Sequence, residues 1–245
     1  MINDDENRRQ LRLAANGTLR WIFDRGYVRL VDFMGTELSV VNAARVSFAK
    51  ESKDFSDSDE KLIKFLLKKG HTSPFRHAFL TFEVKAPLFV ARQWWKYVVG
   101  SDHTMDAWNE MSRRYVEDEL EFYIPFEWRQ APENKKQGSG ENVHEQLGER
   151  LSQDMELNIR LSMKNYQYAL NMGVCAEQAR LFLPAYAMYT TWRWSASLQS
   201  VLHFLSQRTK PDAQFEIQKY ANAVLDLTEL TFPGIIKCYL EEENE

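Results

Sequence analysis

Two kinds of apolar periodicity occupy different parts of this chain, and their order restricts the folds that it can adopt. Residues 27–34 and 79–86 alternate between apolar and polar side chains, which is typical of half-buried strands. In the second half the apolar residues recur at helical spacing, as in Leu147, Leu151 and Met155. We therefore expect an α+β fold with a mixed or antiparallel sheet and a large helical portion in the C-terminal half.

Residues that start and stop helices give the finer boundaries. Asp57 with Glu60 predicts a capping box, and the helix that it starts should end at Gly70. Pro87 suits the first turn of another helix. Residues 190–208 are predicted to be helical, like the rest of the second half.

The chain is expected to form one domain with a leader and an internal excursion. Residues 1–18 carry few large apolar groups, so they are predicted to be a mobile leader. Residues 19–245 are predicted to be a single domain. Within it, residues 121–125 resemble a short strand or extended segment, and the polar, Gly-containing stretch 129–143 is predicted to be a flexible excursion.

Composition and charge exclude several classes of protein. The chain has 31 Lys and Arg against 35 Asp and Glu, for a net charge of −4, which argues against a general nucleic-acid-binding surface. Cys175 and Cys238 are too few for a disulfide framework, so a reducing compartment is expected. A polar N-terminus and the lack of a run of roughly 20 apolar residues predict no membrane partner. We expect a cytoplasmic globular protein.

The densest group of polar and aromatic side chains lies at residues 91–115. On a helix, Arg92 and Lys96 are one turn apart, and Glu110 and Arg114 have the same separation. Cationic and carboxylate groups among Trp side chains are typical of a site for a flat, anionic ligand. The same pattern also fits a surface helix with ion pairs over a Trp-rich core, and the residues alone leave both interpretations open.

Familiar nucleotide and metal motifs are missing from the sequence. It has no Gly-rich phosphate loop and no Rossmann fingerprint. His71 and His77 are separated by a Pro and do not have the spacing of a zinc pair, so no metal site is expected.

Several blocks of the chain, in order, resemble the flavin-dependent thymidylate synthases. RQWW at 92–95 and NEMSRRY at 109–115 are similar to the signature region of that family. Further blocks, including GHTSPFRH, QARLFLP and LSQRTKPDAQFEIQKYA, extend the resemblance over residues 27–230. The signature also departs from the family pattern, since most members have Arg-His-Arg where this chain has Lys96-Tyr97-Val98 and a short insertion.

The resemblance implies an enzyme that methylates dUMP reductively to dTMP. It implies FAD as cofactor, with 5,10-methylenetetrahydrofolate and NADPH as co-substrates. It also implies a homotetramer in which each site takes residues from several subunits. Two alternatives remain: a uracil-nucleotide methyltransferase variant with altered reductant use, motivated by the changed signature, and a non-catalytic helical interaction protein.

The resemblance also assigns roles to individual residues. The residues implied to bind the nucleotide are Gln93, Lys96, Glu110, Met111, Ser112, Arg113, Arg114, Arg180 and Arg208. Those implied to bind the flavin are His71, Ser73, Lys96, Glu110, Ser197, Gln199 and His203. Arg208 is the implied catalytic residue, because a fixed guanidinium stabilises charge that builds on the uracil ring.

The remaining residues of these blocks are interpreted one by one. No His and acid accompany Ser112 in sequence to activate it, so we expect it to hydrogen-bond to the nucleotide rather than attack it. His77 is interpreted as structural. Asp102 and His103 of the inserted loop either rebuild the flavin contacts or lie in solvent. Before the resemblance is considered, a surface ion pair is the favoured interpretation of both Arg180 and Arg208.

Overall fold

Five antiparallel strands form the centre of the fold. The computed structural model describes residues 17–99, 107–111, 120–132 and 138–243. The strands lie in the order β1-β2-β3-β5-β4, and neighbouring strands run antiparallel. Their bounds are Leu19–Ile22 for β1, Gly26–Met34 for β2, Phe79–Pro87 for β3, Ala107–Glu110 for β4 and Tyr189–Ser197 for β5. The prediction of an α+β fold with an antiparallel sheet is confirmed.

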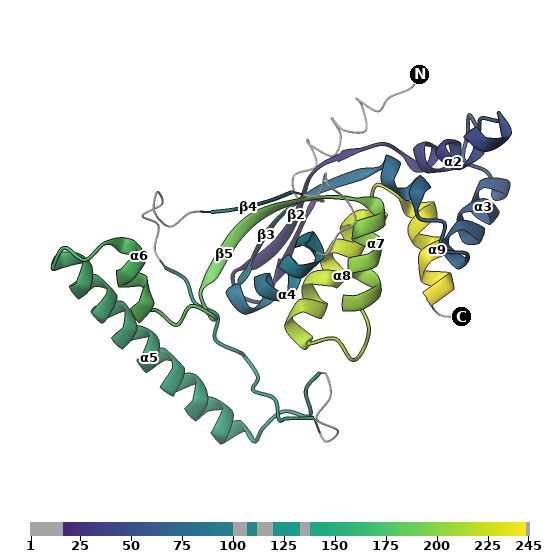
Figure 1. Cartoon of the computed structure of the whole chain (residues 1–245). Coiled ribbons are helices and arrows are strands. Elements are labelled where there is room, and N and C mark those ends of the chain that lie inside the picture. The colour runs from purple at the N-terminus through teal and green to yellow at the C-terminus, as the bar shows by residue number, and fades with distance from the viewer. Residues whose placement is uncertain (1–16, 100–106, 112–119, 133–137, 244–245) are drawn as a thin grey trace.

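Helices pack against one face of this sheet, and further helices lie beyond its two ends (Figure 1). α4 (Leu88–Val99), α7 (Leu198–Arg208) and α8 (Phe215–Glu229) contact the strands. At one end lie α2 (Glu37–Arg45), η1 (Val46–Phe48), α3 (Asp57–Lys68), η2 (Ser73–His77) and α9 (Pro233–Glu243). At the other lie α5 (Glu145–Asn171), α6 (Ala176–Ala179) and η3 (Arg180–Phe182).

The prediction that residues 190–208 form one helix is wrong. Their first part is β5, which lies between β3 and β4, and only Leu198–Arg208 is helical. Trp192, Trp194 and Ala196 alternate toward the core, which is the period of a strand rather than a helix. The second half therefore contributes a central strand as well as helices.

Two smaller boundaries also differ from the predictions. The capping box of α3 is formed by Ser56 and Asp59, one residue before the predicted pair. Pro87 ends β3 rather than starting α4. Residues 121–125 form the predicted extended segment, in which Phe122 makes a single bridge with Met188.

The core beneath the sheet is built from stacked aromatic rings. Trp94 of α4 lies parallel to Phe204 of α7, with ring centroids 4.5 Å apart, and both are fully buried. The Trp94 ring also meets Trp192 and Trp194 edge to face, at 5.5 and 5.4 Å. These contacts fix α4 and α7 against β5, and the two helices carry several predicted site residues.

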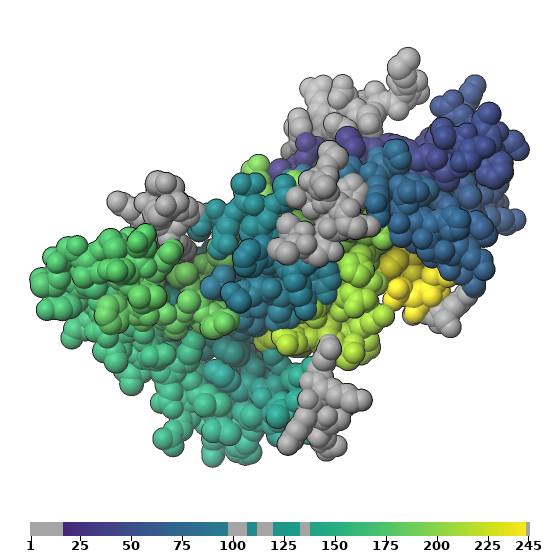
Figure 2. All heavy atoms as spheres, viewed as in Figure 1, coloured from purple at the N-terminus to yellow at the C-terminus, as the bar shows by residue number. Residues whose placement is uncertain are grey.

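The long helix α5 stands apart from this core. In the space-filling view, its segment and that of α6 form one end of the molecule (Figure 2). Its solvent-facing apolar side chains include Leu157, Leu161 and Tyr168. No helix of the described residues has both the length and the apolar character required to cross a bilayer.

The predicted leader and excursion are only partly described. Residues 1–16 of the leader and residues 133–137 of the excursion lie outside the described residues. Where the excursion is described, its two ends pair, because Arg129 and Asn142 form a bridge and the Gln130 amide donates to the Glu141 carbonyl at 2.8 Å.

Candidate active site

Three predicted flavin-binding residues border one hollow between η2, α7 and α9, here named the α7 cleft. His71, Gln199 and His203 line it together with Thr72 and Phe75, and its volume is about 350 Å³. Gln199 and His203 are one turn apart on α7, so both side chains reach the same rim. The fold thus brings together residues more than 120 positions apart in the sequence.

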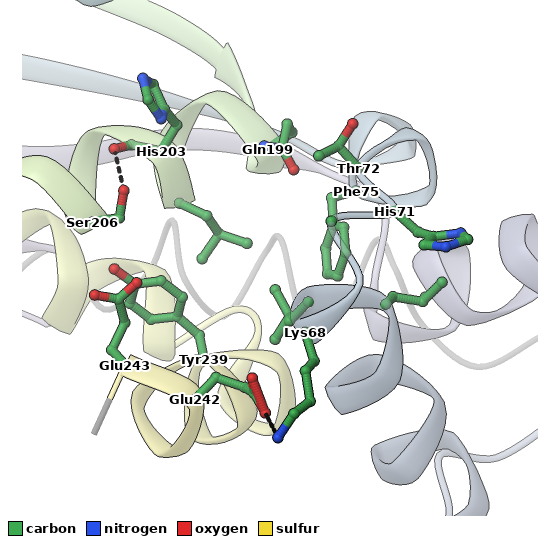
Figure 3. Close-up of a pocket in the computed structure, with 14 residues that line it drawn as sticks. Lys68, His71, Thr72, Phe75, Gln199, His203, Ser206, Tyr239, Glu242 and Glu243 are labelled. Atoms are coloured by element: carbon green, nitrogen blue, oxygen red, sulfur yellow. Dashed lines mark hydrogen bonds and ion pairs between the residues drawn. The ribbon is translucent and has the colours of Figure 1, made fainter. Parts of the chain in front are cut away.

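The two imidazoles lie at the edge of the α7 cleft rather than inside it. Figure 3 shows His71 and His203 on opposite sides, with both rings pointing away from the middle of the hollow. Both side chains are exposed. His71 directly follows Gly70, whose φ of +65° is a left-handed turn that ends α3 and directs the chain into η2. The floor is apolar, with Leu66, Phe75 and Leu202 buried.

The far wall of the α7 cleft comes from α9, which the sequence predictions missed. Tyr239, Glu242 and Glu243 face the hollow (Figure 3), and Glu242 pairs with Lys68 of α3 at 3.7 Å. Burial and the nearby carboxylate of Glu243 raise the pKa of Tyr239, so its hydroxyl is neutral at physiological pH. The spacing of residues on α9 predicts a helix but carries no signal of this wall, which is a tertiary contact.

Two other predicted flavin-binding residues do not line the α7 cleft. Ser197 is fully buried, and its hydroxyl caps α7 by accepting a hydrogen bond from the Ser200 amide at 3.2 Å. Ser73 is exposed at the start of η2. Their predicted role stays a prediction.

A second hollow, here named the α6 pocket, gathers three residues predicted to bind the nucleotide. Glu110, Met111 and Arg180 line it, and its volume is about 560 Å³. Arg180 is exposed, and its Nε donates to the Glu177 carbonyl at 3.2 Å. Ser112, Arg113 and Arg114, like the loop residues Asp102 and His103, lie outside the described residues.

The remaining predicted residues lie where α4 approaches α7 and α8. The amide nitrogen of Gln93 donates a hydrogen bond to Gln214. The Oε1 atom of Gln93 is buried and accepts no hydrogen bond from the described residues. Lys96 is exposed. Arg208 is buried at the end of α7, and its Nε likewise lacks a hydrogen-bond partner within the described chain.

The hydrogen-bonding groups of the α7 cleft fit part of a flavin dinucleotide. At about 350 Å³, the α7 cleft is near the lower limit of ligand pockets, so it would hold a portion of such a molecule. The carboxylates of Glu242 and Glu243 disfavour a phosphate there, whereas Thr72 and Gln199 offer neutral hydrogen bonds beside an apolar floor. Gln93 Oε1 on α4 and Arg208 Nε on α7 are buried polar atoms without a hydrogen-bond partner within the described residues.

Comparisons with known proteins agree with the sequence resemblance. The family model described as thymidylate synthase complementing protein matches residues 29–234. A flavin-dependent thymidylate synthase of Thermosipho africanus is 40% identical over 220 residues, which are 90% of this chain and 93% of the relative. The enzyme of the same name from Thermotoga neapolitana is 38% identical with the same coverage.

A solved structure of similar fold is the UMP/dUMP methylase PolB from Streptomyces cacaoi, bound with 5-Br dUMP. It superposes with a TM-score of 0.77 and 28% identity, over 89% of this chain and 95% of that chain. The family model covers most of the sequence, and the relatives match it nearly end to end. This chain therefore belongs to the thymidylate synthase complementing protein family, the family of the flavin-dependent thymidylate synthases.

Proposed function

We propose that this chain is a flavin-dependent thymidylate synthase that converts dUMP to dTMP. The carbon comes from 5,10-methylenetetrahydrofolate, and the reducing equivalents come from NADPH. FAD, when bound, supplies the hydride chemistry, and the protein supplies binding and electrostatics. The observation that carries the proposal is that His71, Gln199 and His203, assigned to the flavin by the family resemblance, border one cleft in the fold.

The role of Arg208 follows from its burial and its unused donor. C5 of uracil is a weak nucleophile until negative charge builds on the ring. A guanidinium held in a site with little water stabilises that charge more than one in bulk solvent. Arg208 is 9% exposed, and its Nε has no partner within the described residues. We assign it to the uracil ring.

The acidic and hydroxyl groups nearby are assigned to positioning. Glu110, held by Thr190, would orient the nucleotide at the α6 pocket, and Arg180 would meet its anionic part. Ser112 would donate a hydrogen bond to the nucleotide. Lys96 would contact the flavin or its phosphates as a point charge.

A homotetramer with shared sites is the second part of the proposal. The predicted residues of one chain lie in three separate places, and neither the α7 cleft nor the α6 pocket holds all of them. The apolar side chains on α5, such as Leu157 and Leu161, are exposed in the single chain, as is expected of a surface that another copy covers. Light scattering should give four times the 28.8 kDa chain mass.

A cytoplasmic location is also proposed. Both cysteines are free, Cys175 exposed and Cys238 buried, which suits a reducing compartment. Fractionation of the native host would test it.

The function is tested by complementation and by flavin titration. The gene should restore growth without thymidine to a strain that requires it, and the purified protein should bind FAD and turn yellow. NADPH oxidation should depend on dUMP, and dTMP should form only when methylenetetrahydrofolate is present. A colourless protein that fails to complement would refute the proposal.

One further substrate has support from a specific observation. The similar structure PolB is described as a methylase of both UMP and dUMP. UMP should therefore be assayed beside dUMP. Product from UMP at a comparable kcat/KM would extend the proposed function to ribonucleotides.

A further inference from the structure

Tyr97 stands where most members of the family have a His, and its ring contacts two residues with predicted roles in the reaction. The guanidinium carbon of Arg208 lies 5.3 Å from the centre of the Tyr97 ring, within the range of a cation–π interaction. On the same helix α7, the imidazole of His203 meets the ring at 5.9 Å and 60°. Tyr97 thus touches both the predicted uracil-binding cation and a predicted flavin-binding residue.

The ring of Tyr97 is itself fixed by the core. It packs edge to face against the fully buried Phe204, with centroids 5.2 Å apart at 87°. Phe204 in turn stacks on Trp94. The position of Tyr97 is therefore set by the same aromatic stack that holds α4 against α7.

Arg208 is buried without the partner that usually holds a buried guanidinium. No carboxylate within the described residues forms a salt bridge with it, and its Nε lacks a hydrogen-bond partner there. An aspartate beside it would fix its orientation but would also neutralise its charge. An aromatic face attracts the cation and leaves the charge and most of the N–H groups available to a ligand.

We propose that Tyr97 is a positioning residue that holds the Arg208 guanidinium, through the face of its ring, in the orientation required by the uracil ring. The inference rests on the proposed function. It gives a role to a residue at which the chain departs from the family signature. The Tyr97 hydroxyl also accepts a hydrogen bond from Arg208. The proposal assigns the orientation of the guanidinium to the face of the ring, so a ring without the hydroxyl should still hold it.

The electrostatic surroundings agree with a neutral ring. Burial raises the pKa of Tyr97, and the Arg208 guanidinium offsets part of that rise. The phenol therefore stays protonated at physiological pH and does not neutralise Arg208. Lys96 from α4, at 6.0 Å, adds a second cation near the ring.

Three variants of the full-length FAD-loaded protein test the proposal. Tyr97→Leu removes the aromatic face, whereas Tyr97→Phe keeps it and removes only the hydroxyl. Tyr27→Leu is the matched control. Tyr27 is also half-buried and meets an aromatic edge, Trp21 at 5.7 Å, but it lies on β2 beside Glu83.

The dUMP dissociation constant is read from the change in the visible flavin spectrum, and kcat, KM and the FAD dissociation constant are measured in parallel. We expect Tyr97→Leu to lower kcat/KM for dUMP by about tenfold, which lies between the effects of an exposed and of a desolvated cation–π interaction, with FAD affinity changed less than about threefold. For Tyr97→Phe, kcat/KM for dUMP should stay within about threefold of the value for the unchanged protein. Tyr27→Leu should leave all four constants unchanged.

The possible outcomes separate this inference from the proposed function. Suppose that the unchanged protein makes dTMP. The positioning role alone is then overturned if kcat/KM of Tyr97→Leu equals that of Tyr27→Leu. It is also overturned if Tyr97→Phe lowers kcat/KM as much as Tyr97→Leu does. If the unchanged protein binds no FAD and makes no dTMP, the function fails and the inference with it. Should Tyr97→Leu not fold, Tyr97→Met carries the same expectation, since its thioether fills the space flexibly.

Discussion

Thr190 of β5 donates a hydrogen bond to the carboxylate of Glu110 on the adjacent strand β4, at 2.7 Å. Thr190 is 5% exposed, whereas Glu110 is exposed at the lining of the α6 pocket. A buried hydroxyl on a central strand therefore fixes the direction of an exposed carboxylate. Rigid support of this kind is what a group that must orient a nucleotide requires.

Replacing Thr190 with Val tests this support. Thr190→Val is nearly isosteric but has no donor, so Glu110 should lose its orientation. A hydrogen bond to a charged group is worth about 1.5–3 kcal/mol when both partners are fixed, and we expect KM for dUMP to rise by about tenfold. FAD affinity should change less than KM, because Glu110 lines the α6 pocket and not the α7 cleft. Steady-state kinetics and flavin titration measure the two effects.

Thr81→Val is the control for that substitution. Thr81 shares a hydrogen bond of 2.9 Å with Ser195 across β3 and β5, away from the α6 pocket. The Thr81→Val substitution should leave KM for dUMP unchanged. Equal losses in the two variants would show that the Thr190 effect is a general weakening of the sheet.

Arg208→Lys keeps a positive charge at the end of α7 but removes the planar fork. If Arg208 stabilises charge on the uracil ring, kcat should fall by about a hundredfold, the usual cost of one lost transition-state donor. Rapid-quench assays of dTMP formation give this number. Arg193→Lys, on the exposed part of β5, is the control, and a kcat for Arg208→Lys near that of the control would contradict the assignment.

Lys96→Arg would restore the first cation of the family signature. Lys96 is exposed on α4, so the longer guanidinium meets no steric barrier from the core. A bidentate guanidinium binds phosphate oxygens better than an ammonium does, and we expect FAD to bind about threefold to tenfold tighter. Fluorescence titration with FAD measures it. Weaker binding would mean that Lys96 has been adapted to a different contact.

Asp59 is predicted to control the acid stability of the helical end of the fold. Its side chain is 1% exposed and pairs with Arg45 at 2.6 Å. Burial alone would raise the pKa of Asp59, but hydrogen bonds from Ser56, Ser52 and Arg45 outweigh it and lower the pKa to about 2. The ionised form therefore holds the loop after α2 against the start of α3.

The sign of the pH dependence follows from that lowered pKa. The stabilisation is present above the ordinary pKa of 3.8 and is lost as the pH falls toward about 2, for a total of about 2 kcal/mol. Asp59→Asn should lose about 3 kcal/mol near neutral pH, because Arg45 remains partly buried without its partner. The difference between the two proteins should narrow by about 1 kcal/mol between pH 6 and pH 3.

Urea unfolding at several pH values measures this difference. Asp57→Asn, an exposed residue of the same first turn, should change the free energy of unfolding at neutral pH by less than about 0.5 kcal/mol. A constant difference between the unchanged protein and Asp59→Asn down to pH 3 would contradict the account of Asp59.

Local patterns predicted most of the fold, and the failures have identifiable causes. α3, α5 and the strands β2 and β3 follow from periodicity and caps. β5 was predicted as helix because its inward residues Trp192, Trp194 and Ala196 run directly into the apolar face of α7 at Leu198. Because no Gly or Pro separates β5 from α7, nothing in the sequence marks where the strand period ends and the helical period begins.

The candidate site likewise has residues that the sequence predicted and residues that only the structure shows. The family resemblance identified His71, Gln199 and His203, which the fold brings to one cleft. The wall of Tyr239, Glu242 and Glu243 depends on how α9 packs across α3, and the contact of Tyr97 with Arg208 depends on how α4 crosses α7. Contacts of this type are tertiary, and no spacing along the chain encodes them.

The measurement that tests the central claim most directly is dTMP formation by the purified full-length protein. dUMP, methylenetetrahydrofolate and NADPH are supplied with and without FAD, and product is identified by chromatography. The proposed function predicts dTMP only when all four are present, with the loss of product in Arg208→Lys exceeding that in Arg193→Lys. A folded protein that binds FAD yet yields no dTMP from dUMP would contradict it.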